Sequence, residues 1–373
     1  MSAYWTASKP ARRRREAAHL RSDGRVFLFS NLQGLRAIAA LSVVFLHCTS
    51  DTGLDVGISF GHFGVDIFFV ISGFIISYTA STDPDQFMIK RLIRIVPIYW
   101  SATIVLYFLA SLFPHLLHNT TASFTLLLAS LFFVPLEWPG HPGATPLMIL
   151  GWTLNYEMYF YLLYALALKF NRKYASITAA FFVIAIMSVI DIVFRPVTDA
   201  GRFYGKPIVL EFVFGIVIFN MLSLRHRKLG RGPMFYLLIV AIISSLLSCI
   251  AYDIYSSVPN SVVFCGIPAL ILVLSALKLE VDYKYSLTNR LFLLTGDSSY
   301  VLYVLHPYII YGVMRVIFPA AKTWPLPGRF ALVAVLLVIT AAVAIVVHLY
   351  FEKPIMKSLK KRLLRRPSVI GLR

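Results

Sequence analysis

The stretch GHFGVDIFFVISGFIISY, residues 61–78, decides the class of fold. It is almost entirely apolar, contains one acidic residue, Asp66, and has no lysine or arginine. A helix needs about 20 mostly apolar residues to cross the hydrocarbon core of a bilayer, which is roughly 30 Å thick. With its flanking residues, this stretch is long enough to do so. It therefore predicts a transmembrane helix near residues 58–80.

The whole chain has a composition that suits such a helix. Of its 373 residues, 58% are hydrophobic and only 14% are charged, and the mean hydropathy is +0.76. Soluble domains usually carry about 25% charged residues. A charge at the middle of a membrane costs at least about 2.5–3.5 kcal/mol. The composition therefore indicates an integral membrane protein and argues against a soluble globular one.

Apolar runs recur along the chain and predict an all-α polytopic membrane protein with about ten transmembrane helices. An eleventh run, 122–136, is short and ends at Pro135, and runs of that length more often lie at an interface or re-enter the membrane. The ten predicted spans lie near residues 32–50, 58–80, 95–113, 147–168, 176–194, 206–222, 234–251, 260–277, 297–317 and 329–350.

The net charge of +18 comes from 35 Lys and Arg residues against 17 Asp and Glu residues. The basic residues form short clusters between apolar runs, which is typical of cytoplasmic loops and not of a nucleic-acid-binding protein. If 122–136 does not cross, the basic loops face the cytoplasm, as do both termini. The predicted divisions are a basic N-terminal segment over 1–30, a transmembrane domain over 31–356 and a basic tail over 357–373. No cleavable signal peptide is expected in the polar first segment.

Ionisable residues inside membrane spans are costly, so each one is a candidate for function. Arg36 and His47 lie eleven residues apart in the first span, so they share one helix face about 16–17 Å apart. Asp66 enters the second span from the opposite end and is expected near the depth of His47, where a carboxylate would fix the imidazole tautomer. A snorkelling arginine and a packed histidine would explain the first pair without a function.

Two further sets of residues suggest a ligand path. Arg91 and Arg94 share a helix face at the cytoplasmic entry to the third span, and arginines bind phosphate bidentately. Topology alone would also account for them. Gly73 lies on the same stripe as Asp66, where backbone or ligand can approach closely, and Ser72 precedes it. Packing of small residues between helices explains Ser72 and Gly73 about as well.

Later spans add polar residues in mid-membrane. Glu157 lies among tyrosines, five residues after Trp152. The span 297–317 contains Tyr300 and His306, and the proline that follows this histidine frees a carbonyl and kinks the helix.

The last span ends in His348 and Glu352, four residues apart, and Glu352 is expected in an inward salt bridge.

The three cysteines have no CxxC spacing and support neither a disulfide framework nor a zinc site, and no metal is predicted. Buried polar groups spread over several spans, with basic residues at one side, indicate an enzyme or a transporter.

Five stretches are similar, in the same order along the chain, to the motifs of one family. Arg36 and His47 have its Arg-x10-His spacing, and together the stretches resemble the membrane-bound acyltransferase-3 family over roughly 31–356. Thr153 stands where the family has serine. The five stretches are NLQGLRAIAA (31–40), GVDIFFVISGF (64–74), KRLIRIVPIYW (90–100), GWTLNYE (151–157) and SYVLYVLHP (299–307).

The resemblance implies O-acylation in the bacterial inner membrane. An acetyl or succinyl group would pass from cytosolic acyl-CoA to a sugar hydroxyl of a polysaccharide or lipid-linked oligosaccharide at the outer face. His47 would be the base, oriented by Asp66, with an acyl-histidine intermediate as the alternative route. Arg36 is assigned to the catalytic residues and also, with Arg91 and Arg94, to the CoA phosphates or pantetheine path. Ser72 and Gly73 are assigned to the acyl-CoA site. The acceptor pocket is assigned Trp152, Glu157, Tyr300 and His306.

The competing class of function is a proton-coupled transporter of a small polar or lipid-linked substrate. Transporters also line their path with His, Asp and Glu residues. The sequence has no visible pair of broken helices or inverted repeat, which many transporters share. Acyl transfer is therefore the favoured interpretation.

Reporter fusions test the predicted orientation. A reporter fused after Arg373 should be active only in its cytoplasmic form, because ten spans place the basic loops and both termini on that side. Activity of a periplasm-dependent reporter at the same position would contradict the ten-span arrangement.

Overall fold

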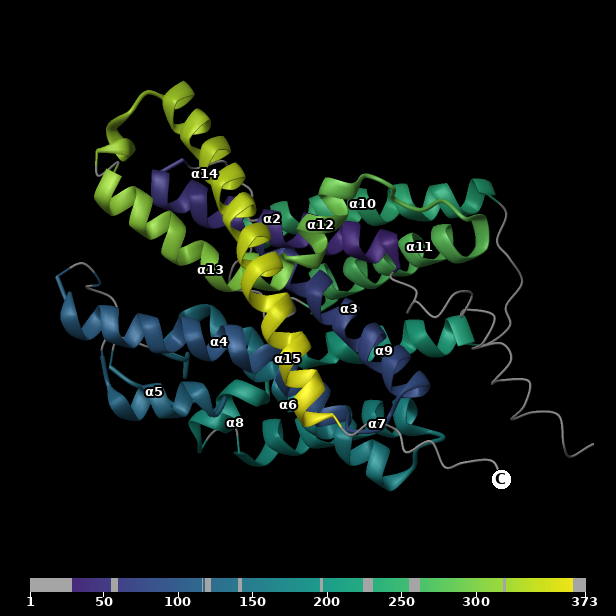
Figure 1. The fold of residues 1–373 in the computed structure, drawn as a ribbon. Helices are drawn as coiled ribbons and strands as arrows, with labels where there is room; N and C mark the ends of the chain where they lie inside the picture. Colours follow the sequence, from purple (N-terminus) through teal and green to yellow (C-terminus); the bar gives the residue numbers. More distant parts are fainter. Residues whose placement is uncertain are drawn as a thin grey trace, which may run out of the picture.

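The computed structural model describes residues 29–54, 60–115, 117, 122–139, 143–194, 197–223, 231–254, 262–317 and 320–364. The secondary-structure elements of the described residues are all helices, as the sequence predicts (Figure 1). One-turn π segments interrupt or extend several of the helices. The α-helices are α2 (Ser30–Thr52), α3 (Phe60–Thr82), α4 (Phe87–Leu112), α5 (Phe124–Leu131), α6 (Trp152–Phe170), α7 (Ala175–Val189), α8 (Asp199–Tyr204), α9 (Leu210–Ser223), α10 (Arg231–Ile254), α11 (Ile267–Tyr283), α12 (Arg290–Asp297), α13 (Ser299–Gly312), α14 (Leu326–Val347) and α15 (Lys353–Leu363).

Each of the ten predicted spans overlaps one of these helices, and the protein is a polytopic membrane protein. Shorter apolar helices cover Pro207–Ser223 and Leu238–Leu247. The helices that carry Glu157 and His306, α6 and α13, belong to neither group. Six helices are long and apolar enough to cross a membrane: Ser30–Thr52, Gly61–Thr82, Phe87–Leu112, Ala175–Phe194, Val262–Tyr283 and Leu326–Leu363.

The predicted short segment 122–136 forms α5, which has only eight residues. A helix of that length rises about 12 Å, too little to cross the hydrocarbon core. Two side chains of α4 hold it: the Tyr99 hydroxyl donates to the Ser130 carbonyl at 3.2 Å and the Trp100 indole N–H donates to the Leu131 carbonyl at 2.9 Å. The segment is therefore a fixed element packed against α4.

The first turn of α2 is capped by another helix. The backbone N–H groups of Ser30 and Asn31 donate to the Glu280 carboxylate of α11 at 2.8 and 2.9 Å. The Asn31 side chain also donates to the Ala276 carbonyl at 3.0 Å. The first N–H groups of a helix lack intrahelical partners and favour negative charge, so these contacts fix where α2 begins.

Helix α3 lies between α2 and α9, and glycines allow both contacts. A Cβ atom at Gly64 would lie 2.5 Å from the carbonyl oxygen of Ala39 in α2. A Cβ atom at Gly73 would lie 2.1 Å from the carbonyl oxygen of Phe212 in α9. Small residues let membrane helices approach this closely. The backbone of α9 thus fills the space beside Gly73, the residue that the resemblance assigns to the acyl-CoA path.

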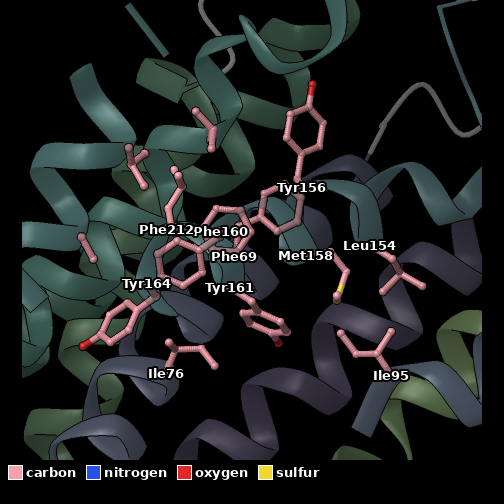
Figure 2. Packing of buried hydrophobic residues seen from close by; sticks show 14 of the residues in the cluster. Phe69, Ile76, Ile95, Leu154, Tyr156, Met158, Phe160, Tyr161, Tyr164 and Phe212 are labelled. Carbon is pink, nitrogen blue, oxygen red and sulfur yellow. The ribbon is translucent and has the colours of Figure 1, made fainter. Parts of the chain in front are cut away.

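Aromatic rings hold α6 against the same pair of helices. Phe212 of α9 stacks on Phe69 of α3 and on Phe160 of α6, with ring centroids 4.6 Å apart in both pairs. Figure 2 shows these three rings at the centre of a larger buried cluster. Stacked aromatic pairs stabilise a core beyond the area that they bury. The cluster therefore fixes the rotation of α6, and with it the position of Glu157.

The close approach of α3 and α9 gives a stability test. Gly73→Ala should lower the thermal unfolding temperature of the detergent-purified protein, because overpacking costs about 1–3 kcal/mol and the clashing atom is backbone. Gly312→Ala is the control, since a Cβ atom there would meet nothing within 4 Å. Equal unfolding temperatures for the two variants would contradict this helix contact.

Candidate active site

Helices α2 and α13 contact each other and carry most of the candidate residues. Arg36 and His47 both lie on the continuous helix α2, so their backbones are about 16 Å apart along its axis. On α13, Tyr300 and His306 are six residues apart, or about 9 Å. Arg36 and Tyr300 mark one end of the site, and His47 and His306 mark the other.

At the histidine end, the rings of His47 and His306 lie 5.1 Å apart between centroids. His306 is buried, and its Nδ1 lies 3.1 Å from the Leu302 carbonyl oxygen. A carbonyl can only accept a hydrogen bond, so Nδ1 carries the hydrogen and Nε2 keeps its lone pair. The Tyr303 carbonyl, which Pro307 leaves without a helical donor, also faces this imidazole.

Within the described part of the chain, the Nε2 atom of His306 is buried and has no hydrogen-bond partner. His47 is half-buried, and His62 of α3 is close enough to interact with it electrostatically. No group of three or more His, Cys, Asp or Glu residues among those described could hold a metal ion. The unpartnered Nε2 of His306 and the imidazole of His47 beside it suit this pair to proton transfer.

The structure does not bring Asp66 to His47. Gly64 faces α2, and Asp66 comes two residues later, about 200° further around the helix. Asp66 thus points toward α9 on the same side as Gly73, and its buried carboxyl group faces the buried carboxyl group of Glu211. The expectation overlooked the rotation of α3 about its axis, and Gly64 also lies level with Ala39 of α2, eight residues before His47.

Sequence reasoning missed Glu211. Its oxygens accept no hydrogen bond from a neutral or cationic donor in the residues that the structure describes. Two buried carboxyl groups in contact are accommodated when they share a proton. Glu211 could have been found as the only acid in the predicted span 206–222.

At the arginine end, Arg94 forms a salt bridge with Glu352, with Nη1 and Oε1 3.1 Å apart. Glu352 is only 1% exposed and is also hydrogen-bonded to His348. This confirms the inward salt bridge expected for Glu352. The guanidinium of Arg94 lies over the Tyr300 ring, 5.7 Å from its centroid, so α4, α13 and the end of α14 meet here.

Glu157 joins this end of the site. It accepts hydrogen bonds from the Ser72 hydroxyl at 2.9 Å and from the Tyr161 hydroxyl. Arg36 and Arg91 both interact electrostatically with its carboxylate. The sequence assigned Ser72 and Glu157 to two different substrates, and the structure brings them together beside the arginines. We call Arg36, Arg91, Arg94, Glu157 and Glu352 the arginine cluster.

Arg91 keeps hydrogen-bonding capacity within the cluster. Its Nη2 donates to the Thr79 hydroxyl at 2.5 Å. Its Nε is buried and has no partner among the described residues. Because a guanidinium has five N–H donors in a planar fork, Arg91 can still bind an anion.

Trp152 lies among aromatic side chains at the start of α6. Its ring meets Phe69 and Tyr156 edge to face, with centroids 6.4 and 5.9 Å away. The neighbouring Asn155 is fully buried, and both polar atoms of its amide lack a partner among the described residues. Sequence reasoning passed over Asn155, although it lies in the same motif as Glu157.

Comparison with known proteins agrees with this arrangement. Residues 29–349 match a family model described as "Acyltransferase domain". The chain belongs to the acyltransferase-3 family. It is therefore a membrane-bound acyltransferase, which decides between the enzyme and the transporter that the sequence left open. No solved structure was found to match it.

Three relatives illustrate the range of similar proteins. "Exopolysaccharide production protein ExoZ" of Rhizobium meliloti is 34% identical over 73% of this chain and 83% of its own length. "Acyltransferase MdmB" of Streptomyces mycarofaciens is 26% identical over 91% of this chain and 94% of its own. "Peptidoglycan O-acetyltransferase OatA" of Listeria monocytogenes is 27% identical over 47% of this chain and 30% of its own.

Thr153 stands where the family motif has serine, and threonine keeps the side-chain hydroxyl group, which forms a hydrogen bond here. Its Oγ1 donates to the Tyr303 hydroxyl at 3.0 Å, and Tyr303 donates to the Leu150 carbonyl at 3.1 Å. This chain of hydrogen bonds ties the start of α6 to α13 between the arginine cluster and the histidine pair.

The charge of Glu157 can be tested separately from its shape. Glu157→Gln keeps an acceptor for Ser72 but removes the charge that balances Arg36 and Arg91, and charged hydrogen bonds are worth about 1.5–3 kcal/mol. We expect a clear drop in thermal unfolding temperature. Glu137→Gln is the control, because Glu137 pairs with Arg202 while 46% exposed, and exposed pairs contribute about 0–1 kcal/mol. Equal shifts in unfolding temperature for the two variants would contradict the conclusion that Glu157 balances the charges of Arg36 and Arg91.

Proposed function

We propose that this acyltransferase moves an acetyl or succinyl group from cytosolic acyl-CoA to a sugar hydroxyl of a surface polysaccharide or exopolysaccharide. The observation that carries the proposal is the arrangement along α2 and α13. These two helices connect an anion-binding arginine cluster to a pair of histidines. Acyl transfer from a phosphorylated carrier needs both parts, a phosphate site at one end and a base at the other.

The arginine cluster suits the phosphate-bearing part of acyl-CoA. Arg91 retains an unpartnered buried Nε, and Arg36 lies deeper along the same path. Arginine forks bind phosphate oxygens bidentately. The pantetheine arm of the coenzyme would then extend about 16 Å along α2 and bring the thioester to His47.

His47 acts as the general base in this proposal. It takes the proton of the sugar hydroxyl while the hydroxyl oxygen attacks the thioester carbonyl carbon. The carbon–sulfur bond then breaks, the ester forms, and the departing thiolate receives the proton. His306, with its Nε2 lone pair, is the second imidazole able to hold this proton. No net proton is gained or lost. An acyl-histidine intermediate remains the alternative route.

A sugar acceptor is supported by the names of two relatives. One is an exopolysaccharide production protein and another is a peptidoglycan O-acetyltransferase. The basic loops and tail support an orientation with the arginine cluster toward the cytoplasm, where acyl-CoA is made. Both termini are then cytoplasmic, and the histidine pair opens toward the outer face of a bacterial inner membrane.

Replacing the proposed base tests the mechanism. His47→Ala should lower the rate of acyl transfer by about 10²–10⁴-fold, the usual loss when a general base is removed. Binding of acyl-CoA should remain, because the arginine cluster is unchanged. The measurement is transfer of radiolabelled acetyl groups to glycan by the purified protein.

His115→Ala is the matched control, since His115 is exposed in the chain beyond α4. A His47→Ala enzyme with near-normal transfer would show that the imidazole only packs. His306→Ala would then be the next variant to measure.

A further inference from the structure

Helix α15 lies beyond the residues that match the family model, which end at 349. It continues the line of α14, and Pro354, which has no N–H group, stands in its first turn. A π turn over His348–Glu352 joins the two helices. It leaves Glu352 buried against Arg94, 3.1 Å away. The ion pair thus fastens the start of α15 to α4, and α15 passes in front of α4 in Figure 1.

This packing brings Lys360 to the arginine cluster. Lys360 interacts electrostatically with Lys90, Arg91 and Arg94 of α4, and no acidic group is among the residues that act on it. Lys90 is paired with Asp83 at 2.5 Å, and Arg94 is paired with Glu352.

Lys360, by contrast, forms no salt bridge with any described residue, and Arg91 shares the charge of Glu157 with Arg36. Like charges held together destabilise a fold unless an anion joins them. Two helices therefore present a surplus of positive charge at one place.

From this convergence we propose that Lys360 binds a phosphate group of acyl-CoA at the entrance to the arginine cluster. The inference rests on the proposed function and extends the donor site to α15. Lys360 is exposed, whereas Arg36, Arg91 and Arg94 are half-buried. A carrier with several phosphates on a long flexible arm fits such a graded series of cations. Lysine contributes a point charge and three donors without demanding one geometry.

The helix offers a matched control for this role. The side of α15 that packs inward carries Glu352, Met356 and Leu359. At 100° per residue, Lys360 flanks this side, whereas Lys361 points about 180° away from Glu352. Lys360→Ala and Lys361→Ala therefore remove the same charge from neighbouring exposed positions of one helix.

The test uses the full-length protein in nanodiscs of zwitterionic phosphatidylcholine. We expect Lys360→Ala to raise the Kd for CoA by roughly tenfold, the scale of one charge-assisted hydrogen bond. Lys361→Ala should change it less than about twofold, since screening weakens distant exposed charges. Lys360→Arg should retain wild-type affinity. With acetyl-pantetheine as the acyl donor, which has no phosphate, Lys360→Ala and wild type should transfer acetyl groups equally well.

Two results would overturn the role of Lys360 and leave the proposed acyl-transfer function unaffected. One is equal CoA affinity for Lys360→Ala and wild type. The other is an effect of Lys360→Ala confined to retention of phosphatidylglycerol in mixed nanodiscs, which would assign the lysine to lipid headgroups. Wild-type protein that binds no CoA in any nanodisc would overturn the proposed function as well, so the two failures are distinguishable.

Discussion

The ion pair between Arg94 and Glu352 is the contact on which the arrangement of the site depends. A buried charge that loses its partner destabilises the fold strongly, and the buried Glu352 carboxylate has Arg94 as its cationic partner. The pair joins α4 to the junction of α14 and α15, and Tyr300 of α13 lies beneath the guanidinium. The same cluster holds Arg36 of α2 and Glu157 of α6. One electrostatic requirement thus gathers helices that are far apart in the sequence.

Features that depend on a single helix could be predicted from the sequence. Apolar runs located the helices because the bilayer imposes both their length and their composition. The relation of Arg36 to His47 also follows from helical periodicity alone, and α2 is continuous between them. The partner of Glu352 was expected in general terms, because a buried carboxylate needs one. The chain's membership of its family followed from motifs that keep their order.

Contacts between helices could not be predicted, because they depend on how each helix is rotated about its axis. Gly64 and Gly73 decide the rotation of α3, and they turn Asp66 toward Glu211 instead of His47. The same rotation brings Ser72 to Glu157. The approach of His306 to His47 and the folding of α15 onto α4 likewise join segments whose spacing in the sequence carries no information about their contact.

We propose that one path through the helices connects phosphate binding at the arginine cluster with chemistry at the histidine pair. Sealed vesicles of known orientation test this path. Radiolabelled acetyl-CoA would be supplied only at the face that exposes α15, with a polysaccharide acceptor confined to the opposite face. We predict labelled ester on that acceptor while the vesicles stay sealed. Label that appears only when donor and acceptor share one face would contradict a path across the membrane.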